Sequence, residues 1–106
     1  MKIGFVYIMS NFKRNSLYIG VTGDIERRVL EHKVGLGSKF TSKYNLHYLL
    51  YFEEIPNIKE AIGREKQLKN WHKEWKWNLI KKENPTLEDL ARDWYRDEDL
   101  DSSLYC

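Results

Sequence analysis

An arginine and a histidine lie one helical turn apart on the same face of a predicted helix. Asp24 is a suitable N-cap for a helix over residues 25 to about 34, in which Ile25 and Val29 must pack inward. Arg28 and His32 share their face and are therefore drawn to the core edge or to the floor of a cleft. An arginine is a fork-shaped hydrogen-bond donor that stays protonated, and a histidine can donate or accept a proton near neutral pH. A histidine that is simply satisfied at the core edge is an equally good interpretation of His32.

Glu65 is a carboxylate on the apolar face of the next predicted helix, which Asn57 caps and which runs to about residue 70. Its neighbours on that face are apolar: Ile58, Ala61, Ile62 and Leu68. Burying a carboxylate there is expensive unless it is paired or binds a cation. Spacing alone leaves two outcomes open, a structural ion pair, for example with Arg28, and a metal ligand.

Two tyrosines lie in a predicted antiparallel hairpin whose strands, residues 5–9 and 17–21, are β-branched and aromatic. With the turn centred on the polar loop between them, Tyr7 is predicted to lie directly opposite Tyr18, with both rings on one face of the sheet. Gly20 shares that face and leaves room for something to approach. Such a tyrosine pair usually contributes only to packing. It indicates a catalytic site only in combination with the other candidate residues.

Capping and periodicity predict the elements that must position these residues. We expect a loop over 35–44, a largely buried strand over 47–55, a helix over 71–82 and a short last helix capped by Thr86 and Asp89. The order ββαβααα predicts an α+β fold, a small three-stranded antiparallel sheet flanked by helices. Residues 1–95 form one domain, and residues 96–106 form an acidic tail that we expect to be flexible.

Charge is divided along the chain more sharply than the net value of +2 suggests. Residues 1–84 carry sixteen Lys or Arg and nine Asp or Glu, whereas residues 85–106 carry two and seven. The 106 residues are 42% hydrophobic and 32% charged, which suits one folded domain and excludes a protein that is charged and disordered throughout. The single cysteine is residue 106, and no apolar run has membrane-spanning length. We therefore expect a soluble cytoplasmic protein without membrane contact.

Taken together, these residues resemble a known family, the GIY-YIG endonucleases. The two-part signature is matched by Val6-Tyr7 and Tyr18-Ile19-Gly20, and Arg28, His32 and Glu65 match the arginine, histidine and glutamate of the family. Phe5 replaces the first glycine of the signature, which affects strand packing more than chemistry. The loop at 37–44 and the Asn84-Pro85 step resemble the small standalone bacterial branch, the UPF0213 or URI-type proteins.

The resemblance implies metal-dependent hydrolysis of phosphodiester bonds in DNA, weakly sequence-specific or structure-directed, in DNA repair or recombination. It implies that Tyr7, Tyr18, Arg28, His32 and Glu65 are catalytic, and that Glu65 holds one divalent ion, Mg²⁺ or Mn²⁺. Either tyrosine could take a proton from the attacking water, which requires a pKa well below about 10. We expect no small-molecule cofactor. A protein partner is one way in which the enzyme could be directed to its DNA substrate.

Phosphate contacts are predicted at four cations: Lys39, Lys43, Arg64 and Lys69. For the neighbouring lysines 66, 73 and 76, solvation of a helix face is the better interpretation. The tryptophans could stack on unpaired bases, but most are expected in the core. Two rival functions stay open: a nucleic-acid-binding module on the same fold that does not cut, and an interaction protein whose acidic tail binds a partner or covers the basic cleft.

Overall fold

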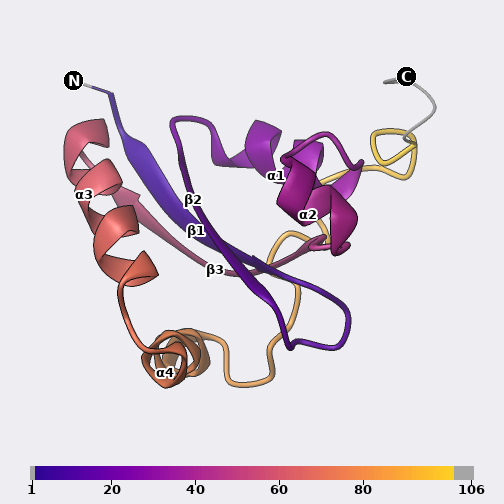
Figure 1. Cartoon of the computed structure of the whole chain (residues 1–106). Helices are drawn as coiled ribbons and strands as arrows, with labels where there is room; N and C mark the ends of the chain where they lie inside the picture. The colour runs from indigo at the N-terminus through magenta and orange to yellow at the C-terminus, as the bar shows by residue number, and fades with distance from the viewer. Residues whose placement is uncertain (1, 102–106) are drawn as a thin grey trace.

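A three-stranded antiparallel sheet organises the chain, with helices on both faces (Figure 1). The computed structural model describes residues 2–101. The strands are β1 (Gly4–Ser10), β2 (Leu17–Thr22) and β3 (Tyr48–Ile55), and the helices are α1 (Ile25–Lys33), α2 (Lys39–Lys43), α3 (Ile58–Lys69) and α4 (Lys73–Glu83). The sheet order is β2-β1-β3. The predicted α+β class, the three-stranded sheet and the order of its main elements are confirmed.

Side-chain alternation along the central strand β1 divides the core into two halves. Val6 and Ile8 face α3 and α4 and pack with Ala61, Leu68 and Ile80. Tyr7 and Met9 face the opposite side and pack with Ile25 and Val29 of α1. Figure 1 shows α1 and α2 on one side of the sheet and α3 and α4 on the other. The candidate residues on α1 and the candidate residue on α3 therefore lie on different faces of the sheet.

The register of the hairpin differs from the prediction by two residues. Tyr7 lies opposite Gly20, and Tyr18 lies opposite Met9. The hairpin turn is displaced because Arg14 adopts a left-handed conformation, with φ of 57°, and its backbone N–H bonds to the carbonyl oxygen of Asn11. A shift by two keeps every side chain on its predicted face. Tyr7 and Tyr18 consequently share a face as diagonal neighbours.

Two predicted local structures are wrong. The expected loop at 35–44 contains α2, a five-residue helix capped by Ser38. The expected last helix is a series of turns, because Asp89 is used in tertiary contacts instead of as an N-terminal capping partner. Its Oδ1 accepts from the backbone N–H of Leu49, and its Oδ2 pairs with Lys33. This anchors the segment after α4 along the outer edge of β3.

The acidic C-terminal segment is described as far as Asp101, and residues 102–106 lie outside the described residues. Arg96 pairs with Glu98 there, and Tyr95 donates a hydrogen bond to the carbonyl oxygen of Glu26 on α1. The predicted flexibility of residues 96–106, and a role in covering a cleft, stay predictions. No helix within residues 2–101 is long and apolar enough to cross a membrane.

Candidate active site

A buried hydrogen-bonded cluster links β1 to α1. Tyr7 is 1% exposed, and its Oη lies 2.8 Å from Nε2 of His32, which is fully buried. Arg28 donates from Nε to the same Oη over 3.3 Å. Both partners reach Tyr7 because they lie one turn apart on the face of α1 that covers β1. The structure thus brings together Tyr7, Arg28 and His32.

The hydrogen bonds of this cluster continue into α2. Nδ1 of His32 lies 3.0 Å from Oγ1 of Thr41, a fully buried residue that sequence reasoning did not select. Thr41 donates to the carbonyl oxygen of Ser38 and accepts from its backbone N–H, within a reciprocal cap. A Cβ on Gly37 would lie 2.6 Å from Cε1 of His32, so the loop before α2 fits closely around the imidazole. The spacing of Ser38 and Thr41 is a capping signal that could have revealed this short helix.

Proton positions in the cluster follow from hydrogen-bond accounting. Burial lowers the pKa of His32 to about 4, with electrostatic contributions from Arg28 and His47 adding to the effect, so the ring is neutral at pH 7. Because Arg28 donates to Tyr7, the single phenol proton of Tyr7 is free to point at Nε2 of His32. Nδ1–H of His32 then donates to Thr41. This assignment gives every polar group in the cluster a partner.

The two tyrosines have different environments. Burial raises the pKa of Tyr7 to about 12, against the opposing effect of the hydrogen bond from Arg28. Tyr7 is therefore a neutral phenol at pH 7, which does not match the lowered pKa that a catalytic base requires. Tyr18 is only partly buried, its ring centroid lies 5.4 Å from that of His32, and it stacks on Phe40 of α2 at 6.3 Å.

Gly20 has a different role from the one predicted. A Cβ at this position would lie 2.5 Å from Cζ of Tyr7, which crosses directly over it. The space that the missing side chain leaves is filled by the ring of Tyr7 and is not open to a ligand.

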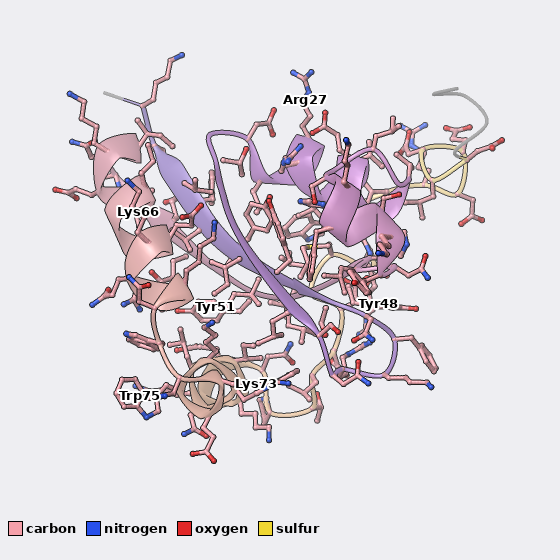
Figure 2. All side chains as sticks on the ribbon, viewed as in Figure 1. Arg27, Tyr48, Tyr51, Lys66, Lys73 and Trp75 are labelled. Carbon is pink, nitrogen blue, oxygen red and sulfur yellow. The ribbon has the colours of Figure 1, made fainter. Side chains whose placement is uncertain are left out.

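Arg28 faces both the buried cluster and the surface. Its side chain is 29% exposed, and Nη1 donates to Oε1 of Glu31 at 3.1 Å. It borders a hollow of about 560 Å³ that is lined also by Lys2, Thr22, Gly23, Asp24, Arg27 and Glu31. Arg27 points outward from α1 (Figure 2), and its side chain is 77% exposed. Arg28 is therefore placed to hold Tyr7 with one nitrogen and an anion with others.

Glu65 lies on α3, on the face that packs against the sheet from the other side. Its side chain is 14% exposed, and Oε2 lies 3.3 Å from Nζ of Lys69, one turn later. The ion pair with Arg28 that spacing allowed is not formed, because the two helices cover opposite faces of the sheet. Glu65 forms no hydrogen bond or ion pair with Tyr7 or His32.

The two faces meet along the outer edge of β2, which pairs with no strand within residues 2–101. A hollow of about 270 Å³ there brings Tyr18 and Lys69 together and is lined also by Leu17, Ile19, Phe40 and Lys76. Lys69 therefore lines the hollow that contains Tyr18 and also pairs with Glu65. Phe40 was not selected from the sequence, and Lys76 was assigned to a solvated helix face. Both reach this hollow because of how α2 and α4 pack.

The four predicted phosphate-binding cations have different surroundings. Lys39 is exposed on α2, and Nζ of Lys43 lies 5.4 Å from the ring centroid of Tyr44. Lys69 lines the hollow beside β2. Arg64 instead pairs with Glu53 of β3 at 2.9 Å and lies over the ring of Trp71. Its guanidinium connects α3 to the sheet, so its hydrogen-bond donors are used within the fold.

The donor set suits a sparsely ligated Mg²⁺ or Mn²⁺ and no enclosed metal centre. Residues 2–101 hold no group of three or more histidine, cysteine, aspartate or glutamate side chains placed to share an ion. Glu65 is a single, nearly buried carboxylate already neutralised by an ammonium group. Mg²⁺ keeps several waters and commonly binds through one or two carboxylates and the phosphates of its substrate. Glu65 fits that mode of binding.

Comparison with known proteins defines the class. A family model of the GIY-YIG catalytic domain matches residues 3–84. The chain belongs to this family, as its sequence motifs predict. It is similar to UPF0213 proteins: 39% identical over 75 residues to one from Haloquadratum walsbyi (71% of this chain, 83% of the relative), 36% over 76 residues to one from Staphylococcus haemolyticus (72% and 92%), and 33% over 91 residues to one from Clostridium perfringens (86% and 97%). No solved structure gives a significant match.

Proposed function

We propose that this chain is an endonuclease that hydrolyses phosphodiester bonds in DNA with the help of one divalent ion, Mg²⁺ or Mn²⁺. The observation that carries the proposal is the contact of Arg28 with Tyr7, beside a neutral, buried His32. A cluster used only for packing would not need an arginine whose other nitrogens face a surface hollow. Membership of the GIY-YIG family supports the same reaction.

Arg28 binds the phosphate in this mechanism. Its Nε is held by Tyr7 and its Nη1 by Glu31, so the guanidinium is fixed in orientation before substrate arrives. The remaining N–H groups donate to the oxygens of the scissile phosphate and stabilise the negative charge that grows there during attack. A lysine could supply the positive charge but not the two parallel N–H donors of a planar guanidinium.

Burial divides the work between the two tyrosines. Tyr7, at 1% exposure and with a raised pKa, positions Arg28 and donates a hydrogen bond to Nε2 of His32. Tyr18 lines the hollow beside β2, so its phenol is the one that attacking water can reach, and it acts as the general base. His32 holds Tyr7 in place through one nitrogen and is itself held by Thr41 through the other.

Glu65 would hold the divalent ion, in place of the ammonium group of Lys69. A bound ion supplies positive charge at the scissile phosphate and assists ionisation of water. Water and substrate oxygens complete the ligand set. The catalytic set of the proposal is therefore Tyr7, Tyr18, Arg28, His32 and Glu65.

The setting follows from the surface of the chain. Lys39, Lys43 and Lys69 give it positive charge around the site, which favours any nucleic acid regardless of sequence. We expect cleavage to be directed by DNA structure, in repair or recombination and in the cytoplasm, with a protein partner as a source of targeting. The alternative is a binding module on the same fold that does not cut.

Plasmid nicking with Mg²⁺ or Mn²⁺ tests the proposal. Wild type should convert supercoiled DNA to the nicked form only with the ion present, and Glu65→Ala should abolish the conversion. Tyr18→Phe should abolish it while leaving the free energy of unfolding unchanged, whereas Tyr7→Phe should lower both. DNA binding without nicking of any DNA form would support the binding module. Cleavage that survives Glu65→Ala would show a contaminating nuclease.

A further inference from the structure

Two adjoining hollows run along the free edge of β2. The first, of about 270 Å³, contains Tyr18, and the second, of about 320 Å³, continues toward the hairpin loop and is lined by Asn15, Ser16, Leu17, Phe40, Lys73 and Lys76. Leu17, Phe40 and Lys76 belong to both hollows, so the two form one groove, here called the edge groove. It begins at the proposed base Tyr18 and leads away from it.

One wall of the edge groove is basic. Lys69 ends α3, and Lys73 and Lys76 lie one turn apart at the start of α4. Lys76 donates to the carbonyl oxygen of Lys69, so its ammonium group lies at the C-terminal end of α3. No aspartate or glutamate within residues 2–101 forms an ion pair with Lys73 or Lys76. Figure 2 shows Lys73 on the side of α4 that faces the hairpin. The wall therefore offers positive charge to an anionic chain.

The opposite wall is aromatic. Phe40 is 46% exposed and stacks on Tyr18 with an angle of 28° between the ring planes. An aromatic ring in a basic groove binds a nucleobase through its π-face. A base inside a duplex presents its faces only to neighbouring base pairs, so this ring can be used only by an unpaired base. Lysine on one side and an exposed ring on the other is the arrangement that suits a single strand.

We propose that the edge groove binds an unpaired segment of DNA, with a base stacked on Phe40 and the backbone along Lys69, Lys73 and Lys76. This inference rests on the proposed function, in which Tyr18 is the general base. It specifies the form of DNA that reaches Tyr18. The groove delivers a single strand to Tyr18, and a fully paired duplex of the same sequence lacks the free base that Phe40 requires.

Binding without metal tests this inference apart from cleavage. Fluorescence anisotropy with EDTA present compares a labelled DNA single strand with the duplex of the same sequence. The chain should bind the single strand more tightly, and Phe40→Ala should weaken that binding about 5- to 150-fold. Trp75→Ala is the matched control, because Trp75 is 52% exposed on α4, points outward in Figure 2 and lines neither hollow. It should leave the affinity nearly unchanged.

A second pair of variants guards against misfolding of Phe40→Ala. Lys76→Gln should reduce the slope of log affinity against log salt on single strands by about 0.7, and Lys82→Gln, exposed on the same helix and outside both hollows, should not. Equal or tighter binding of duplex, an equal loss from Trp75→Ala, or tighter binding of an RNA strand would overturn the inference. Selective loss in Phe40→Ala would support the groove even if no DNA were cut, and duplex-preferring cleavage would refute the groove and leave the nuclease standing.

Discussion

Acidification should weaken the fold through His32. The folded chain keeps this ring neutral down to a pKa of about 4, whereas an exposed histidine has a pKa near 6.5. Between these values the unfolded chain binds a proton that the folded chain refuses, so the free energy of unfolding falls as the pH falls. Each pH unit in that window is worth about 1.4 kcal/mol, so the full loss attributable to His32 is roughly 3 kcal/mol. Below pH 4 both states bind the proton and the loss from this residue stops.

Urea unfolding followed by tryptophan fluorescence measures this loss at a series of pH values from 7 to 4. His32→Gln cannot gain the charge, so its stability should vary less with pH by the amount assigned to His32. His72→Gln, at an exposed position, should keep the wild-type dependence. Carboxylates such as Glu53 also titrate at the acidic end, but wild type and both variants share that contribution. Parallel curves for wild type and His32→Gln would refute the buried, neutral histidine and the proton assignment built on it.

Three further substitutions test the geometry around Tyr7 and the role of Arg64. Thr41→Val leaves a buried N–H of the imidazole without an acceptor and should lower the free energy of unfolding in urea by about 1–3 kcal/mol. Thr41→Ser should restore that stability. A valine variant as stable as wild type would contradict the hydrogen bond between His32 and Thr41. Gly20→Ala places a methyl group 2.5 Å from Cζ of Tyr7 and should reduce both stability and nicking; retention of both would show that the ring can move aside. Arg64→Ala removes the partner of Glu53 and should lower thermal stability without weakening DNA binding; lost DNA affinity in a stable variant would return Arg64 to the phosphate path.

Local geometry explains the predictions that succeeded. Arg28 and His32 meet Tyr7 because helical spacing fixes their common face, and that face is set by the apolar residues beside them. The fold class follows in the same way from alternation in the strands and from the caps at Asp24 and Asn57, whose side chains accept backbone hydrogen bonds as expected. These features depend on residues within a few positions of one another.

The failures concern contacts between elements that are distant in the sequence. The role predicted for Gly20 depended on the hairpin register, which is shifted by the turn in which Arg14 is left-handed. The partner of Glu65 depended on which sheet face α3 covers. Asp89 carries a capping signal, but its carboxylate binds Leu49 and Lys33 instead. Lys76 could be placed in a groove only after α4 was placed against β2.

The central claim is that the cluster around Tyr7 and Arg28 cleaves DNA, and paired arginine variants test it most directly. Single-turnover nicking at saturating protein, with Mg²⁺, compares Arg28→Ala with Arg27→Ala. Arg27 is the adjacent cation and borders the same hollow, but it points outward, forms no hydrogen bond with Tyr7 and pairs with Glu31 only at 3.8 Å. Arg28→Ala should slow cleavage at least about 100-fold, while Arg27→Ala should cleave at nearly the wild-type rate. Equal rates in the two variants would contradict the assignment of this cluster as the catalytic site.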